Sequence, residues 1–135
     1  MAAATPLNFT KLIVGDLERS AAYYESVFGL AELYRFEGKI AGDPFQQVVM
    51  GVDGAMAGGL ILVRFTERGA PPNGAVILGF MAPDLAALVD RAVASGGSVH
   101  SEMRDPKIPG VAFVAFLADP DGHLAEVLQP ATAEA

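Results

Sequence analysis

The side chains that could carry chemistry in this 135-residue chain are of few kinds. The sequence has no cysteine, which excludes thiolate zinc sites, disulfides and thiol nucleophiles, and only two histidines. Three charged residues remain of interest because each interrupts an apolar, strand-like run: Lys11, Arg64 and Glu126. Lys11 and Arg64 could hold an anionic or carbonyl-bearing molecule, and Glu126 could accept a hydrogen bond or a proton. A salt bridge between Glu126 and one of the two cations is an equally weighted alternative that needs no ligand.

The elements that must position these residues occur twice along the chain. Asp16 and Asp84 each precede a leucine and open a helical pattern, and the two lie 68 residues apart. Asp53 and Asp121 are also 68 residues apart, and each precedes a glycine in a dipeptide that favours a tight turn between strands. The repeat predicts two copies of one supersecondary unit.

Each copy is expected to be a βαβββ module, which makes the fold α+β. The apolar runs predict four strands in the first half and four in the second, at Phe9–Val14, Glu32–Phe36, Gln46–Val52, Leu60–Phe65, Ala75–Met81, Ser98–His100, Val111–Leu117 and His123–Gln129. The modules cover residues 7–66 and 75–130 of a single domain, and the polar, proline-rich stretch 67–74 links them. Segments 37–45 and 102–110 are expected to be loops. Pairing two such sheets, within one chain or across a dimer, would form a cupped cavity.

Composition excludes several classes of partner. The formal net charge of −7 would repel a nucleic-acid backbone over most of the surface. The longest apolar runs are less than half the ~20 residues that a membrane-spanning helix needs. The first residues show no secretory pattern, so a cytoplasmic location is expected, with neither nucleic acid nor membrane as partner.

Two motifs resemble those of the glyoxalase, bleomycin-resistance and extradiol-dioxygenase group, the vicinal oxygen chelate superfamily. One comprises Asp16–Ser20 with Tyr23-Tyr24 and Phe28–Leu30 on the first helix, and the other is Ala118–Glu126 in the last hairpin. The resemblance covers nearly the whole chain and implies paired βαβββ modules. It does not define a reaction, because the superfamily contains lyases, isomerases, epimerases, dioxygenases, thiol transferases and proteins that only sequester antibiotics.

The resemblance also implies four metal-ligand positions, which family enzymes fill with His, Glu or Gln. They fall on Phe9, near Leu62, on Ile77 and on Glu126, with an uncertainty of one or two residues at Leu62. Only Glu126 can donate an electron pair to a cation, and Ile61 and Val63 are as inert as Leu62. We therefore expect no metal and no other cofactor.

Strand alternation extends these four positions to a predicted cavity wall, because residues two apart share a face. The expected wall residues are Phe9, Lys11, Ile13, Leu62, Arg64, Thr66, Ile77, Gly79, Met81, Leu124, Glu126 and Leu128. Within this mainly apolar wall Lys11, Arg64 and Glu126 should converge, with Glu126 and Lys11 as candidate catalytic groups. His123 has the opposite parity and is expected to face away, while His100 should be exposed and Tyr24 should lie in the core.

Three functions remain open. The first is metal-independent binding of a small, partly hydrophobic molecule with an anionic or carbonyl group. The second is a metal-dependent lyase, isomerase or dioxygenase of the superfamily, and the third is proton transfer by Glu126 and Lys11 without metal. A homodimer is expected in each case, because one chain's repeat leaves apolar sheet surface uncovered.

Overall fold

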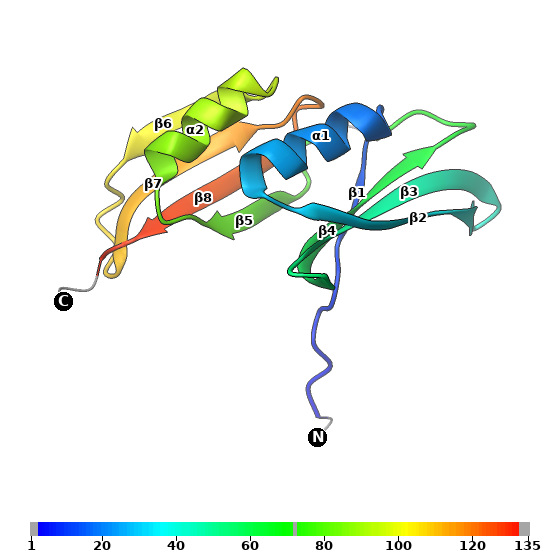
Figure 1. Cartoon of the computed structure of the whole chain (residues 1–135), viewed down its shortest axis with the longest axis horizontal. Helices are drawn as coiled ribbons and strands as arrows, with labels where there is room; N and C mark the ends of the chain where they lie inside the picture. Colours follow the sequence, from blue (N-terminus) through cyan, green and yellow to red (C-terminus); the bar gives the residue numbers. More distant parts are fainter. Residues whose placement is uncertain (1–2, 72, 133–135) are drawn as a thin grey trace. The chain divides into compact units, whose positions relative to one another are not determined.

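The computed structural model describes residues 3–71 and 73–132, which form two four-stranded sheets and two helices. The chain divides into two compact units. The first contains the chain up to Ala21 together with Gly29–Ala70, and the second contains Ala22–Phe28 and the chain from Pro71 onward. Figure 1 labels the elements of both, and the α+β fold with two modules is confirmed.

Both sheets follow the same plan, in which the first and last strands of a module lie side by side and parallel. The first sheet has the order β1-β4-β3-β2, formed by β1 (Lys11–Ile13), β2 (Ala31–Ile40), β3 (Asp43–Val52) and β4 (Ala55–Phe65). The second has the order β5-β8-β7-β6, formed by β5 (Ile77–Met81), β6 (Ser98–Arg104), β7 (Val111–Ala118) and β8 (Leu124–Pro130). The helices are α1 (Leu17–Phe28) and α2 (Leu85–Ala94).

The helix boundaries follow from the residues that cap them. The Asp16 carboxylate accepts the Arg19 N–H at 3.0 Å, and the Asp84 carboxylate accepts the Ala87 N–H at 3.1 Å. Each aspartate thereby satisfies a backbone donor that has no partner within its helix. After the last turn, Gly29 takes a φ of 70° and lets the chain leave α1.

The first expected loop, 37–45, is largely strand, so that prediction was wrong, and the second, 102–110, is shorter than predicted. β2 continues to Ile40 and meets β3 through a tight turn at Ala41 and Gly42, whose φ angles are 49° and 87°. This long curved hairpin lies at one edge of its sheet (Figure 1). A strand at the edge of a sheet that is exposed on both faces does not need apolar residues at alternate positions. The polar residues at the end of β2 therefore resembled a loop. Likewise β6 extends to Arg104, so only 105–110 remain outside strands in the second segment.

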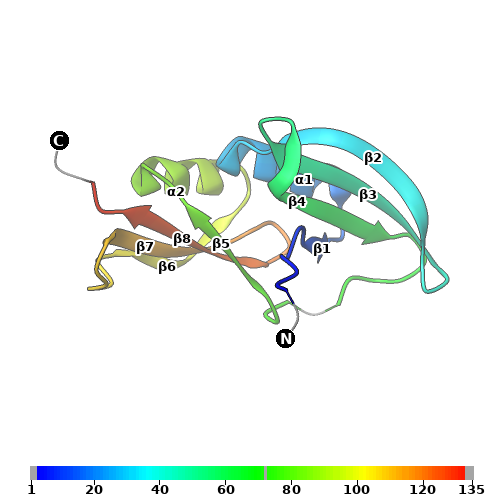
Figure 2. The same cartoon turned by 90° about the horizontal axis from the view of Figure 1, so that it is seen from below.

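α2 covers one face of the second sheet, as Figure 2 shows. Its residues Leu85, Leu88 and Ala92 are buried, spaced as one face of a helix requires. The sheet beneath it contributes Leu117 and Val127, both fully buried. Neither helix of the described residues is long and apolar enough to cross a bilayer.

A buried carboxylate ties the second half of α1 to the turn before β8. Asp119 is 6% exposed and accepts the Tyr24 hydroxyl at 2.8 Å, while its other oxygen accepts the N–H groups of Asp121 and His123, each at 2.9 Å. Burial raises the pKa of Tyr24 and also that of Tyr23, the latter to about 12, so both hydroxyls stay protonated at neutral pH. The core position predicted for Tyr24 is confirmed, since it is 1% exposed.

Replacing Tyr24 with Phe should destabilise the protein by about 1–3 kcal/mol, because one oxygen of a buried carboxylate would lose its hydroxyl donor. Denaturant unfolding measures the change. Tyr34→Phe is the matched control, since Tyr34 is 55% exposed and its change should leave the midpoint in place. Equal midpoints for Tyr24→Phe and the parent protein would contradict the role given to this hydrogen bond.

Candidate functional site

Lys11 lies on an apolar face of the first sheet. The parallel register places Lys11 beside Ile61 and Ile13 beside Val63, so these side chains share a face with Phe45 and Val49. The Lys11 ammonium donates to the Gln47 side-chain oxygen at 3.1 Å and lies 5.3 Å from the centre of the Phe45 ring. Around this polar pair is a cluster formed by Phe45, Val49, Ile61, Val63 and Phe65, with Ile13 against it.

The same register separates Lys11 from Arg64. Leu12 pairs with Leu62, so Leu62 and Arg64 project from the face opposite to Lys11, and the single cavity wall predicted for the first module was wrong. Thr66 follows the end of β4, is exposed and donates its hydroxyl to the Pro44 carbonyl at 3.4 Å. The position near Leu62 that faces the Lys11 side is therefore Ile61 or Val63.

Glu126 lies on the face of the second sheet turned away from α2. It pairs with Gly79 on one side and Phe116 on the other, and Ile77 and Met81 lie on the same face, 53% and 66% exposed. Leu124, which is half-buried, pairs with Ile77. The face predicted for these second-module residues is confirmed, whereas their roles in binding stay predictions.

Open space adjoins the Glu126 carboxylate. A β-carbon on Gly79 would have no atom within 4 Å, and the Glu126 carboxylate makes no hydrogen bond or ion pair with another described residue. The carboxylate is half-buried and pairs with no other side chain of the described residues. It is therefore free to act on a ligand.

His123 gives no support for a general base. It precedes β8, so strand alternation does not place its side chain, and its backbone N–H is bound by Asp119. His100 is exposed, as expected.

The donor set does not fit a divalent metal. Three of the four metal-ligand positions that the resemblance implies hold hydrocarbon side chains, namely Phe9, Ile77 and either Ile61 or Val63. Only Glu126 could donate to a cation. Catalytic zinc normally takes three protein ligands, and Mg²⁺ or Ca²⁺ needs several oxygens. No group of three or more His, Cys, Asp or Glu residues able to hold a metal occurs among the described residues.

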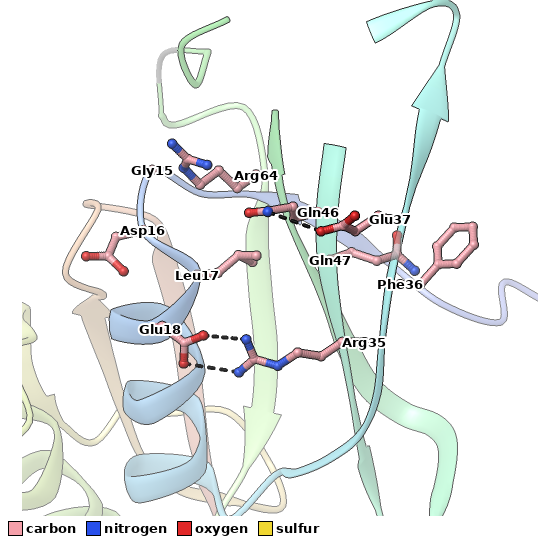
Figure 3. A pocket seen from close by; sticks show the side chains of 10 residues that line it. All are labelled: Gly15, Asp16, Leu17, Glu18, Arg35, Phe36, Glu37, Gln46, Gln47 and Arg64. Carbon is pink, nitrogen blue, oxygen red and sulfur yellow. Dashed lines mark hydrogen bonds and ion pairs between the residues drawn. The ribbon is translucent and has the colours of Figure 1, made fainter. Parts of the chain in front are cut away.

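Arg64 instead lines a cavity of about 520 Å³ on the other face of the first sheet. The cavity is bounded by the first turn of α1, by Gly15 and by strands β2–β4, and Figure 3 shows the Arg64 guanidinium beside the Gly15 turn. Gln46, the cross-strand partner of Arg64, donates its side-chain amide to Glu37 at 3.3 Å.

A charge network closes one side of this cavity. Arg35 forms a bidentate pair with Glu18 and donates to Glu32 at 3.0 Å (Figure 3 shows the Glu18 pair). The hydrogen bonds from Arg35 hold the pKa of Glu18 below its ordinary value. Arg35 is thus committed to two carboxylates.

The sequence contained a signal for Gln47 that the prediction missed. Gln47 is 6% exposed and is a polar residue inside the apolar run of β3, at the parity of Phe45 and Val49. A buried amide at a core-facing position requires a partner, which here is Lys11. The cavity at Arg64 had no such signal, because it is formed by turns and strands distant in the sequence.

Comparison with known proteins gives consistent matches over the chain's length. The family model described as Glyoxalase/Bleomycin resistance protein/Dioxygenase superfamily matches residues 7–127. Two proteins named probable lactoylglutathione lyase, from Vibrio parahaemolyticus and Vibrio cholerae, are each 30% identical over 129 residues, covering 93% of this chain and 91% of theirs.

Solved structures match in fold. A glyoxalase family protein from Bacillus cereus superposes with a TM-score of 0.80 at 13% identity, covering 97% of each chain. The trypanothione-dependent glyoxalase I of Leishmania major gives 0.72 at 22% identity, covering 93% of this chain and 87% of its own. A fosfomycin resistance protein from Listeria monocytogenes, complexed with Mn(II), superposes with a TM-score of 0.68 at 18% identity. The match covers 96% of this chain and 95% of that protein.

Proposed function

Since the chain belongs to the Glyoxalase/Bleomycin resistance protein/Dioxygenase superfamily, we propose that it binds a small, partly hydrophobic molecule without a resident metal. The ligand carries an anionic or carbonyl group. The observation that carries this proposal is the Lys11–Gln47 pair, a cationic donor set within an apolar, aromatic face.

Lys11 has the capacity to bind such a group. An ammonium has three N–H donors, and Gln47 takes one of them at 3.1 Å. The Phe45 ring at 5.3 Å and the neighbouring Ile13 supply apolar contact next to the charge. A mainly apolar surface with a few fixed polar groups is the usual form of a small-molecule site.

Glu126 is the proposed acceptor for a hydrogen bond or proton from a ligand. Its support is the half-buried carboxylate beside Gly79, flanked by the exposed Ile77 and Met81. If turnover occurs, Glu126 and Lys11 are the groups that would transfer protons, since both can exchange a proton without metal.

A metal-dependent lyase is the second candidate, favoured by the relatives named probable lactoylglutathione lyase. The hydrocarbon side chains at Phe9 and Ile77 count against it, because they cannot replace the ligands that such an enzyme needs. Sensitivity of any activity to chelators separates the two candidates. A cytoplasmic location stays a prediction.

Lys11→Met should weaken ligand binding while keeping the fold, because it retains the apolar stem and removes the charge. The expected loss is about tenfold or more, the usual effect of losing a charge-assisted hydrogen bond. The measurement is a thermal-shift screen of aromatic carboxylates and carbonyl compounds, followed by calorimetric titration of the best binder. Lys39→Met on the exposed part of β2 is the control. Unchanged affinity in Lys11→Met would refute the assignment.

We also propose a homodimer, supported by the exposed Ile77 and Met81 on the second sheet. Light scattering at micromolar concentration should give about twice the 14.0 kDa chain mass. Met81→Glu should shift the distribution toward monomer if this face is covered by the second copy. A parent protein that remains at the mass of one chain would contradict the dimer.

A further inference from the structure

We propose that the cavity at Arg64 is a second ligand site, which takes a small carboxylate that also carries hydrogen-bond donors, such as an amino acid or a hydroxy acid. Arg64 projects from the opposite face of the first sheet from Lys11, so its guanidinium is separate from the site proposed above, although Gln47 borders this cavity as well. Its floor is formed by β2–β4 and its rim by Gly15 and the first turn of α1 (Figure 3).

The first observation is that Arg64 is half-buried and that its guanidinium has no acceptor among the described residues. Among the described residues its guanidinium forms no hydrogen bond or ion pair, whereas Arg35 binds two glutamates and Arg68 pairs with Asp43 at 3.7 Å. A guanidinium presents five N–H donors in a planar fork that matches a carboxylate. Partial burial without an acceptor leaves those donors poorly solvated, and an entering carboxylate would satisfy them.

The second observation is that Arg64 lines two neighbouring cavities of the first unit. The cavity of about 520 Å³ and another of about 440 Å³, formed with the stretch after β4, have Arg64 and Gly15 in common. The guanidinium therefore has room for an acceptor on either side. No residue of the described chain occupies these spaces.

The third observation concerns the acidic side chains that line the cavity, because they determine which groups the ligand should carry besides its carboxylate. Asp16 accepts the Arg19 N–H, Glu37 accepts the Gln46 side-chain amide, and Glu18 accepts two donors of Arg35. Three carboxylates against two arginines disfavour a multiply charged anion such as phosphate. Carboxylate oxygens have several lone pairs, so Asp16 and Glu37 can still accept from an ammonium or hydroxyl on the ligand.

The test uses the full-length protein and NMR titration with L-serine, propionate and inorganic phosphate. Serine combines a carboxylate with donors, propionate has the carboxylate alone, and phosphate has the higher charge. Serine should give saturable shifts at the Arg64 Nε–H and at the Gly15 and Gln46 amides, with propionate and phosphate weaker. Arg64→Met should weaken serine binding by about tenfold or more. Arg104→Met, at an exposed position of β6, should not change it.

The wild-type titration keeps the test informative even if Arg64→Met folds poorly, because the shifts locate the ligand without any substitution. Absence of saturable shifts at Arg64 with serine would overturn the site. Phosphate or propionate binding as tightly as serine would overturn the ligand class. Serine shifts confined to the Lys11 face would assign it to the other site and refute this one.

Discussion

The parallel pairing of β1 with β4 determines which side chains share each face of the first sheet. Lys11 opposite Ile61 puts the ammonium and Gln47 on one face, and Leu12 opposite Leu62 puts Arg64 on the other. A slip of one residue would exchange the two sets. Lys11 and Arg64, which were predicted to converge on one cavity wall, therefore lie on two chemically distinct faces of the sheet.

In the second unit β5 pairs with β8 in the same parallel manner. Here strand alternation in the sequence predicted correctly which residues share a face. The residues facing α2 are apolar and buried, as Leu117 and Val127 are, while Glu126 and the exposed Met81 share the other face. The Asp119 carboxylate fixes the turn that leads into β8 by accepting three hydrogen bonds. Strand β8, which carries Glu126, thus begins from a turn held by defined bonds.

The sequence predicts which way a strand's side chains face only where one side of the strand is buried and the other is exposed. The repeat, the aspartate caps and the helix ends were predictable, because a cap or an αL glycine is a local requirement. The face of Arg64 was not, since Leu60–Val63 is apolar at every position and buried on both faces, which removes the alternation that reveals parity. The parts of β2 and β3 within residues 37–45 were missed for the opposite reason, because β2 is exposed along nearly its whole length and has no buried face to reveal a strand.

We infer that this member of the superfamily binds its ligand without a resident metal, because hydrocarbon side chains occupy three of the four metal-ligand positions that the resemblance implies. The most direct measurement is calorimetric titration of chelator-treated, full-length protein with Zn²⁺, Ni²⁺ and Mn²⁺, alongside elemental analysis of the protein as purified. We expect no stoichiometric metal in either experiment. Stoichiometric binding that Glu126→Ala abolishes would contradict it.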